Sequence, residues 1–446
     1  MKINKPKILI ISSANPLKGP GVMASDIYKA YKKYGYEADV LTKFKCEKYP
    51  EFLYIYENAK DEKKLSNRLT HYFFYRIYEK LRRIITFKPF PKGSYTFFYR
   101  KEEDPPISID KVLNKITKNY DLVQIIFWQG LLSFATVQAI YRKLNCLFYF
   151  SCVDYSPMSG GCHFVGDCER YKVGCGCCPA YNSKNPQDFT WHNVNYRKKV
   201  YDEVDPIVTG NSYMFGFYDQ SILLKDRKRV LSSPIIDTSI FKPYPKDYIK
   251  KKLNISIQKD FLILFGCQGI NDERKGIKYL IEGINIFTKK LSDQQRKRVL
   301  IMSIGQSFES IRSQFAGIDT LDLGYVSQEE LARIYSVADV FLCSSVNDAG
   351  PMMVNQALCC GTPVVGFEMG ACLDAVKDKG TGYCARLRDT DDYANGIHYI
   401  YNLTDEQRKS MSNTCVKLAL DTYTYKAAVD RIIGAYYSCK RPKMTY

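Results

Sequence analysis

The chain has 446 residues, of which 46% are hydrophobic, and its 65 Lys and Arg outnumber its 47 Asp and Glu to give a formal net charge of +18. This length suits two domains that each bury a core, and the positive charge favours phosphate-bearing or anionic partners. No run of 18 apolar residues occurs and the apolar run Ile8–Ile11 is too short for a signal peptide, so we expect no membrane span and a cytoplasmic protein.

Short apolar runs alternate with helical patterns along the whole chain, which predicts an open parallel α/β architecture. The expected strands of the first half are Lys7–Ser12, Glu37–Thr42, Leu122–Ile126, Leu147–Cys152 and Pro206–Thr209. Those of the second half are Phe261–Gly266, Val299–Ile304, Val340–Cys343 and Pro363–Phe367. The stretch Pro234–Pro245 separates the halves and predicts a stiff hinge. A last helix is expected at Tyr425–Cys439.

A loop with two glycines, Gly19 and Gly21, follows the first expected strand. Because glycine has no Cβ, a ligand can approach the backbone closely there. The glycine spacing does not fit the dinucleotide-binding fingerprint. An ordinary strand-to-helix turn is the alternative interpretation.

The segment Lys63–Lys101 is rich in both basic and aromatic residues: it carries eleven of each and one acidic residue, Glu79. Its apolar residues recur at helical spacing, interrupted by Arg76 and Lys80. Such a helix can lie on an anionic bilayer surface. It can equally form an excursion over residues 60–110 that packs its aromatic side chains into the domain.

The chain has 16 cysteines, and a reducing cytoplasm makes a disulfide framework an unfavoured interpretation. Four of them lie in a cysteine-rich insert, residues 154–190: Cys162, Cys168, Cys175 and Cys178. Their spacing allows one tetrahedral zinc, with Cys177 or His163 as substitute ligands, and such a metal would be structural because four protein ligands leave no open position. Buried free thiols or a redox-labile pair are the alternatives.

The stretch Asp348–Val365 follows an apolar strand and reads as a polar loop, a helix and a second strand. Gly350 and Pro351 fit a helix start with proline at the first helical position. Gly361 fits the helix end, where a left-handed residue closes the last turn.

The start of this helix predicts an anion site. The free N–H groups of Met352, Met353 and Val354 would face the crevice at the strand ends, where anions bind. Asp348 and Gln356 could flank that anion and hydrogen-bond hydroxyl groups. The arrangement suits a sugar joined to a nucleoside diphosphate.

These residues resemble the E-x7-E signature of retaining glycosyltransferases of family 4, which have the GT-B fold. The resemblance implies that Asp348 binds the donor sugar and Gln356 the ribose, although each departs from the family's glutamate. It implies two Rossmann-like, doubly wound parallel-sheet domains facing across a cleft. Residues 1–238 would bind the acceptor and residues 239–424 the donor, with the helix of residues 425–446 returning to the first domain. The glycine-rich loop would place Gly19 and Gly21 over the donor phosphates.

Two further stretches resemble donor-site turns of the family. Lys275 aligns with a lysine that neutralises the departing diphosphate, while the expected arginine position is Ile270 and Arg274 is its replacement. Tyr325 and Val326 fall in the turn that contacts the nucleobase. GT-B enzymes generally lack a catalytic metal, so none is expected and cationic side chains with helix dipoles must stabilise the charge.

The stretch Asp154–His163 resembles a subgroup that builds capsular and colanic-acid-type polysaccharides. The acceptor-site histidine of that pattern is replaced by Val153, and its histidine-rich strand end appears here as Gln124, Ile126 and Gln129. Asp154 and Gln129 remain candidates for acceptor contact, and His163 is the closest histidine by sequence. Retaining transfer does not require an enzyme base if the leaving phosphate accepts the proton.

The resemblance implies a cytoplasmic retaining glycosyltransferase, peripheral on the inner face of the membrane if the basic segment binds lipid. It would move a sugar from a nucleotide-diphosphate sugar to a glycan or lipid-linked glycan in surface-polysaccharide biosynthesis. One alternative is a catalytically silent GT-B protein that partners an active transferase, as the lost histidines suggest. The other is a nucleic-acid-binding protein with a four-cysteine zinc module; it leaves Asp348–Val365 unused, so nucleic acid is the less favoured partner.

Overall fold

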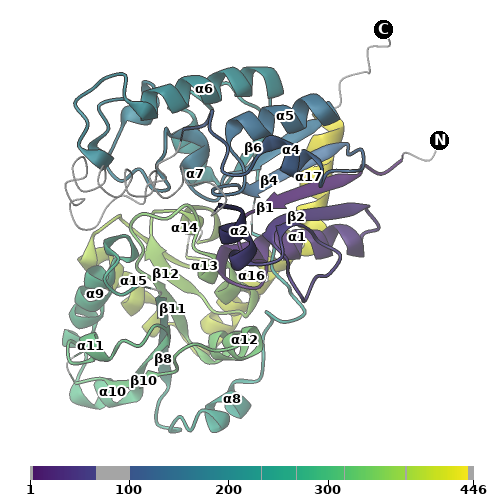
Figure 1. Cartoon of the computed structure of the whole chain (residues 1–446). Helices are drawn as coiled ribbons and strands as arrows, with labels where there is room; N and C mark the ends of the chain where they lie inside the picture. Colours follow the sequence, from purple (N-terminus) through teal and green to yellow (C-terminus); the bar gives the residue numbers. More distant parts are fainter. Residues whose placement is uncertain are drawn as a thin grey trace. The chain divides into compact units, whose positions relative to one another are not determined.

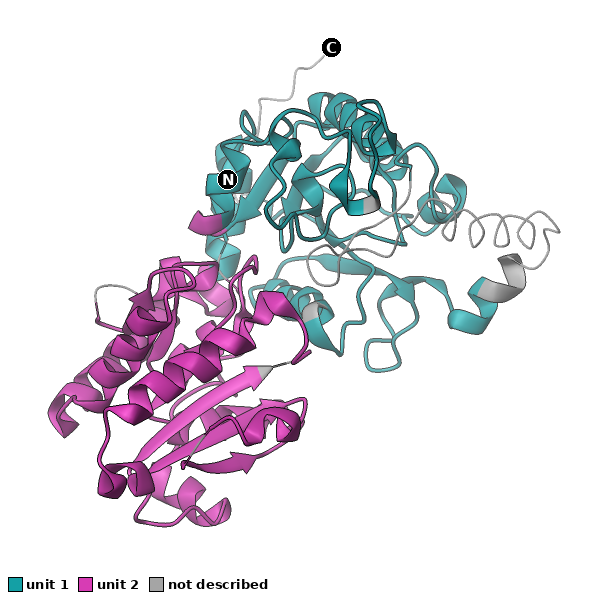
Figure 2. Ribbon diagram, turned by 90° about the vertical axis from the view of Figure 1, so that its left-hand side faces the viewer, with its two compact units in different colours: residues 1–210, 214–232, 428–446 teal, residues 211–213, 233–427 magenta. Residues whose placement is uncertain are grey.

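The chain forms two compact units, which Figure 2 distinguishes by colour. This computed structural model describes residues 4–66, 101–232, 234–267, 269–315, 317–376 and 379–439. Unit 1 comprises residues 1–210, 214–232 and 428–446, and unit 2 comprises residues 211–213 and 233–427. The main boundary therefore lies at residue 232, close to the sequence-based boundary at 238.

Unit 1 is built on a seven-stranded parallel sheet in the order β3-β2-β1-β4-β5-β6-β7 (Figure 1). Its strands are β1 (Ile8–Ser12), β2 (Ala38–Phe44), β3 (Leu53–Tyr56), β4 (Leu122–Phe127), β5 (Leu147–Ser151), β6 (Ile207–Gly210) and β7 (Arg229–Leu231). Its helices are α1 (Val22–Lys33), α2 (Ala59–Ser66), α4 (Ile109–Leu113), α5 (Phe134–Leu144), α6 (Phe189–Val204), most of α7 (Ser212–Tyr218) and most of α17 (Tyr425–Cys439).

The end of the described chain is anchored to unit 1. Helix α17 has the bounds predicted from the sequence, and Ala428 and the residues after it lie with unit 1. The Tyr149 hydroxyl of β5 donates a hydrogen bond of 3.0 Å to the carbonyl oxygen of Ile432 in this helix.

Unit 2 is built on a six-stranded parallel sheet in the order β10-β9-β8-β11-β12-β13. Its strands are β8 (Phe261–Cys267), β9 (Val299–Gly305), β10 (Asp319–Asp322), β11 (Val340–Cys343), β12 (Val364–Phe367) and β13 (Gly382–Ala385). Its helices are α8 (Lys246–Lys252), α9 (Ile277–Lys289), α10 (Asp293–Arg298), α11 (Glu309–Arg312), α12 (Gln328–Val337), α13 (Met352–Cys359), α14 (Ala371–Ala375), α15 (Thr390–Tyr401) and α16 (Asp405–Thr422). Helix α9 packs on α15, while α13 packs on α12 and α16, and Figure 1 shows these two groups on opposite faces of the sheet.

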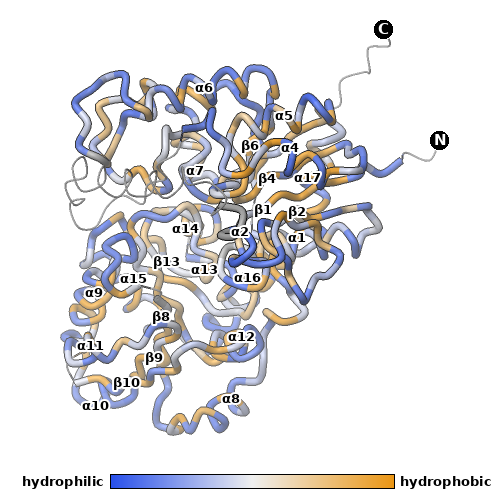
Figure 3. Tube along the Cα trace, in the orientation of Figure 1, coloured by the Kyte–Doolittle hydropathy of each residue, from blue (hydrophilic) through white to orange (hydrophobic). Residues whose placement is uncertain are grey.

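The strands form because their side chains are apolar on both faces, as the strands of a parallel sheet covered by helices must be. Every residue of β1, β4 and β11 is buried. Figure 3 shows the hydrophobic residues concentrated on the central strands of each unit. Each large apolar side chain buried in this way contributes about 1.5–3 kcal/mol.

Several helices begin at sequence-encoded caps. Helix α12 starts at a capping box in which the Ser327 hydroxyl accepts from the Glu330 N–H and the Glu330 carboxylate accepts from the Ser327 N–H. Thr404 and Gln407 form the same arrangement at α16. Such caps satisfy N–H groups that have no partner within the helix.

The nine predicted strands are all present, whereas four strands were not predicted. These are β3, β7, β10 and β13, which are the outer strands of the two sheets. An outer strand pairs on one side only and need not be uniformly apolar. The exposed or half-buried residues of β10, with sequence Asp-Thr-Leu-Asp, illustrate why hydrophobic runs do not reveal such strands.

Each sheet has one topological switch point, where the strand order reverses. It lies between β1 and β4 in unit 1 and between β8 and β11 in unit 2. In open α/β sheets, ligands bind outside the carboxyl ends of the strands at this point. The loops that follow these four strands are therefore the places to look for a site.

Candidate active site

The loops after β8 and β11 pack tightly against each other at the switch point of unit 2. The Val346 N–H donates to the Arg274 carbonyl oxygen over 2.8 Å, and the Ser344 hydroxyl donates to the Lys275 carbonyl oxygen over 2.8 Å. Gly276 has φ +64°, and a Cβ placed on it would lie 1.9 Å from the Ser344 carbonyl oxygen. Only glycine allows this approach, so Gly276 permits the two loops to pack against each other.

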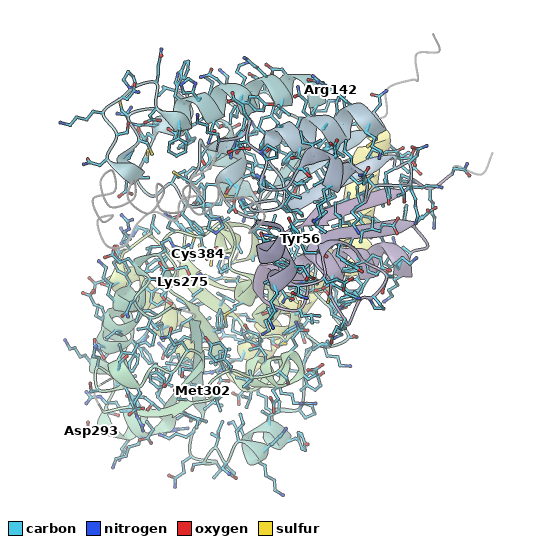
Figure 4. The ribbon with its side chains drawn as sticks, in the orientation of Figure 1. Tyr56, Arg142, Lys275, Asp293, Met302 and Cys384 are labelled. Atoms are coloured by element: carbon cyan, nitrogen blue, oxygen red, sulfur yellow. The ribbon has the colours of Figure 1, made fainter. Side chains whose placement is uncertain are left out.

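These loops bring Lys275 and Asp348 into direct contact. The Lys275 Nζ lies 2.7 Å from the Asp348 Oδ2, and the two side chains are 28% and 16% exposed. Burial lowers the pKa of Lys275, but the Asp348 carboxylate raises it more, and the net pKa lies above its ordinary value. The ammonium group is therefore held charged beside the switch point. Figure 4 labels Lys275 within unit 2.

The Asp348 loop is fixed by further contacts. The other carboxylate oxygen of Asp348 accepts from the Gly350 N–H over 3.1 Å. The Asn211 side-chain amide donates to the carbonyl oxygen of Ala349. A Cβ on Gly370, which has φ +53°, would lie 2.9 Å from the Asp348 carbonyl oxygen. The loop before α14 thus also packs against the Asp348 backbone.

Arg274, which the sequence paired with Lys275, is bonded to a neighbouring carboxylate. Its side chain donates to Asp272 from Nε over 3.1 Å, and Asp272 also caps the short turn Glu273–Lys275 through the Arg274 N–H. The diphosphate contact of Arg274 stays a prediction, and it would require competition with Asp272.

Helix α13 begins one residue later than the sequence suggested. Pro351 is the N-cap and Met352 is the first helical residue, so the prediction of proline at the first helical position was wrong. Pro351 has no N–H to donate, and its carbonyl oxygen accepts a hydrogen bond from the Val354 N–H over 3.2 Å. Of the three amides predicted to be free, that of Val354 is therefore engaged.

The helix end agrees with the prediction. Gly361 adopts φ +78° and its N–H donates to the Leu358 carbonyl oxygen over 3.0 Å. The first turn approaches β8 closely, because a Cβ on Gly266 would lie 2.1 Å from the Met353 Cε. Gln356 is half-buried in the middle of the helix.

The turn after β10 presents an exposed aromatic residue. Tyr325 is 74% exposed, and Val326 beside it is half-buried. The Asp322 carboxylate accepts from the Gly324 N–H over 3.2 Å and from the Ser303 hydroxyl over 2.9 Å. The turn that carries Tyr325 is thereby tied to β9.

In unit 1, one of the two glycines in the loop after β1 is required by the packing of the loop itself. A Cβ on Gly21 would lie 2.0 Å from the Asn15 carbonyl oxygen, so the loop's own backbone requires glycine there. Gly19 differs, since it has φ +52° and a Cβ on it would meet nothing within 4 Å. The space beside the Gly19 backbone is therefore open, and its contact with a ligand stays a prediction.

A buried carboxylate and an imidazole meet beyond the carboxyl end of β5. The Asp154 Oδ2 lies 2.6 Å from the His163 Nδ1, with side chains 2% and 26% exposed. The other Asp154 oxygen accepts from the Ser156 N–H over 2.7 Å, and the Tyr155 N–H donates to the His163 carbonyl oxygen over 3.1 Å. The sequence identified both residues but did not pair them. Gln129, after β4, is half-buried, and its side-chain Oε1 accepts from the Trp128 N–H over 3.3 Å.

The four cysteines proposed as zinc ligands lie near one another in unit 1. Burial raises the pKa of the Cys162 thiol well above its ordinary value, and Cys178, Cys175 and Cys168 add to this rise. In the parts of the chain that the structure describes, no three His, Cys, Asp or Glu side chains are arranged to hold a metal ion. Structural zinc thus stays a prediction.

Two expectations concern membranes. The basic and aromatic segment falls almost wholly on residues 67–100, outside the described residues, so its placement stays a prediction. Within the described ranges, no helix has both the length and the apolar character required to cross a membrane.

Sequence reasoning did not single out Asp272, the carboxylate that holds the Arg274 side chain. The adjacency of Asp272 to the basic pair in the sequence was the available signal.

Comparisons with known proteins support the fold and relate part of unit 2 to a known family. Residues 249–416 match the family described as glycosyl transferases group 1. Two curated relatives are the D-inositol 3-phosphate glycosyltransferase of Stackebrandtia nassauensis and the lipopolysaccharide 1,2-N-acetylglucosaminetransferase of Salmonella typhimurium. Each is 22% identical to this chain. The first match covers 56% of this chain and 57% of the relative, and the second covers 54% of this chain and 64% of the relative. The chain thus spans less than two thirds of either relative.

A solved structure extends the similarity to both units. The Anabaena Alr3699/HepE protein in complex with UDP and glucose superposes with a TM-score of 0.59 at 14% identity, covering 97% of this chain and all of that one. This likeness establishes the GT-B fold. The predicted fold class, two Rossmann-like parallel-sheet domains, is confirmed.

Proposed function

We propose that this protein is a retaining glycosyltransferase that moves a sugar from a nucleotide-diphosphate sugar to a glycan acceptor. The observation that carries the proposal is the Lys275–Asp348 contact of 2.7 Å at the switch point of unit 2. The match of residues 249–416 to group 1 glycosyl transferases supports it. UDP is the first nucleotide to test, because a fold neighbour was solved with UDP and glucose.

In this proposal, the donor diphosphate takes the place of Asp348 at the Lys275 ammonium group. The Met352 and Met353 N–H groups at the start of α13 add positive potential beside it. Asp348, released from Lys275, binds hydroxyl groups of the donor sugar. Gln356 binds the ribose, and the Tyr325–Val326 turn lies against the base.

The transfer step follows from these contacts. The bond between the anomeric carbon and the diphosphate oxygen breaks, and both electrons leave with the diphosphate. The acceptor oxygen bonds to the anomeric carbon on the same face, and its proton passes to the leaving phosphate. Lys275 stabilises the charge that develops on that phosphate, and this kind of stabilisation is often the largest contribution to catalysis.

The acceptor is proposed to bind unit 1 at Asp154 and Gln129. The Asp154 carboxylate is bonded to the Ser156 N–H and paired with His163, so a sugar hydroxyl would have to compete with these partners for it. We propose a lipid-linked glycan of surface-polysaccharide biosynthesis as the acceptor class. This rests on the sequence resemblance and on one relative whose name specifies lipopolysaccharide.

The test combines binding and turnover on the full chain. Calorimetric titration with UDP, GDP, ADP and CDP should show saturable binding of at least one nucleotide, with duplex DNA as the control ligand. The corresponding nucleotide sugar should be hydrolysed or transferred, and NMR of the product should show the anomeric configuration of the donor. Binding without turnover would favour a silent partner protein, and binding of DNA alone would favour the nucleic-acid alternative. An inverted anomer would refute retention.

A further inference from the structure

Two cysteines flank a single glycine on the sheet of unit 2. In the parallel register, Cys343 of β11 is the partner of Gly366 of β12, and Gly366 is the partner of Cys384 of β13. Neighbouring strands lie about 4.8 Å apart, so each cysteine is adjacent to the glycine.

A third thiol occupies the space that the glycine leaves. Cys372 of α14 places its Sγ 2.5 Å from the point that a Cβ of Gly366 would take, and the Cys343 Cβ lies 3.5 Å from the same point. Any larger residue at 366 would therefore displace the Cys372 sulfur. Figure 4 labels Cys384, which marks this row of the sheet.

The pKa values of Cys343 and Cys372 shift in opposite directions. A hydrogen bond from the Cys372 thiol lowers the pKa of Cys343 below its ordinary value, although burial and the Asp348 carboxylate act in the opposite direction. The same hydrogen bond and burial raise the pKa of Cys372 well above its ordinary value. Burial raises the pKa of Cys384 to about 12. Cys343 is thus the thiol of this group that most readily becomes a thiolate, which is the reactive form.

We propose that Cys343 and Cys372 form a reversible thiol–disulfide site whose oxidant is a small hydroperoxide. The Cys343 thiolate attacks one peroxide oxygen, the O–O bond breaks, and a sulfenic acid and hydroxide form. The Cys372 sulfur then attacks the Cys343 sulfur, its proton leaves with the departing oxygen, and water is released. The two thiols lose two electrons, and hydrogen peroxide is reduced to two molecules of water.

The bridge would act on the donor loops, a consequence that rests on the proposed function. Cys343 leads directly into Ser344, whose hydroxyl bonds to the Lys275 carbonyl oxygen over 2.8 Å. Cys372 follows Gly370, which packs against the backbone of Asp348. A covalent bond between β11 and α14 would therefore move the loops that hold Lys275 and Asp348 in place. We expect weaker binding of the nucleotide diphosphate by about tenfold, the loss of one charge-assisted hydrogen bond.

The test uses the purified full chain, treated with hydrogen peroxide at low molar excess and then alkylated. Peptide mass mapping should reveal one cross-link between the peptides that contain Cys343 and Cys372. Dithiothreitol should reverse it and restore UDP affinity. Cys343→Ser and Cys372→Ser should prevent the cross-link, whereas Cys384→Ser, on the other side of Gly366, should retain it. Circular dichroism verifies that each variant is folded.

The outcomes separate this site from the proposed function. Peroxide that leaves both residues as free thiols, or that over-oxidises Cys343 without a cross-link, would overturn the site. A cross-link that persists in Cys372→Ser would also overturn it, because another cysteine would then be the partner. If the cross-link forms but no nucleotide binds the untreated protein, the thiol site stands and the glycosyltransferase proposal fails.

Discussion

The Lys275 ammonium group is expected to provide a large share of the affinity for the donor diphosphate. Lys275→Ala removes a cation whose Nζ lies 2.7 Å from Asp348 and whose side chain is only 28% exposed. The substitution leaves the Asp348 carboxylate without this partner beside the phosphate position. Both changes act against an anionic ligand.

The magnitude follows from the kind of contact that is lost. A hydrogen bond to a charged group contributes about 1.5–3 kcal/mol. Since about 1.4 kcal/mol corresponds to a factor of ten, UDP should bind roughly 10- to 150-fold more weakly. The repulsion from Asp348 places the expected value toward the upper end of this range.

Isothermal titration calorimetry with UDP measures the effect, and two variants sharpen it. Lys278→Ala removes an exposed lysine three residues along, which lies over the Tyr279 ring at 4.8 Å, and should leave UDP binding unchanged. Asp348→Asn releases Lys275, so UDP should bind equally well or more tightly while transfer from the nucleotide sugar falls. If Lys275→Ala leaves UDP affinity unchanged, the reasoning is refuted. It is also refuted if Asp348→Asn weakens UDP binding as much as Lys275→Ala does.

Three more predictions concern stability and packing. Arg197→Met breaks a buried pair in which the Arg197 Nε donates to Glu102 over 2.9 Å, and should cost about 3–5 kcal/mol of unfolding free energy in urea; a cost below about 1 kcal/mol would contradict it. Gly276→Ala should lower both the unfolding free energy and UDP affinity, because residue 276 has φ +64° and the added Cβ would lie 1.9 Å from the Ser344 carbonyl oxygen. Wild-type values of both quantities would show that the two loops can separate without consequence. The stability difference between wild type and Lys275→Met should be constant from pH 7 to the ordinary lysine pKa of 10.5 and shrink above it. The sign follows because a lysine whose pKa is raised in the folded state stabilises that state while the lysine is protonated, and this stabilisation is lost as the pH rises through its folded-state pKa. Urea unfolding at several pH values measures the stability difference. A difference that grows with pH would exclude the Asp348 pairing as its cause.

Hydrophobic runs identified the inner strands because those strands are buried on both faces. Val340–Cys343 was predicted with its observed bounds, and all four of its residues are buried. The outer strands lack this signal, since each pairs with only one neighbouring strand and need not be uniformly apolar. Helix ends were predictable where a single residue type decides the conformation, as at Gly361 with φ +78°.

The start of α13 shows where local reasoning reaches its limit. Proline fits both the N-cap and the first helical position by its own φ, so residue type does not separate the two. The observed start places the Pro351 carbonyl oxygen 3.2 Å from the Val354 N–H, which removes one amide from the predicted anion site.

The sequence alone determined the alternation of strands and helices, the spacing of Asp348 and Gln356, and the basic pair Arg274–Lys275. These are local properties, because periodicity and turn chemistry depend on residues close in the chain. Only the tertiary structure decided which distant residues meet. The strand order places the loops after β8 and β11 side by side and joins Lys275 to Asp348. It also seats the Cys372 sulfur beside Cys343, since a strand's neighbour in a parallel sheet is set by the crossover connections and not by any residue within the strand.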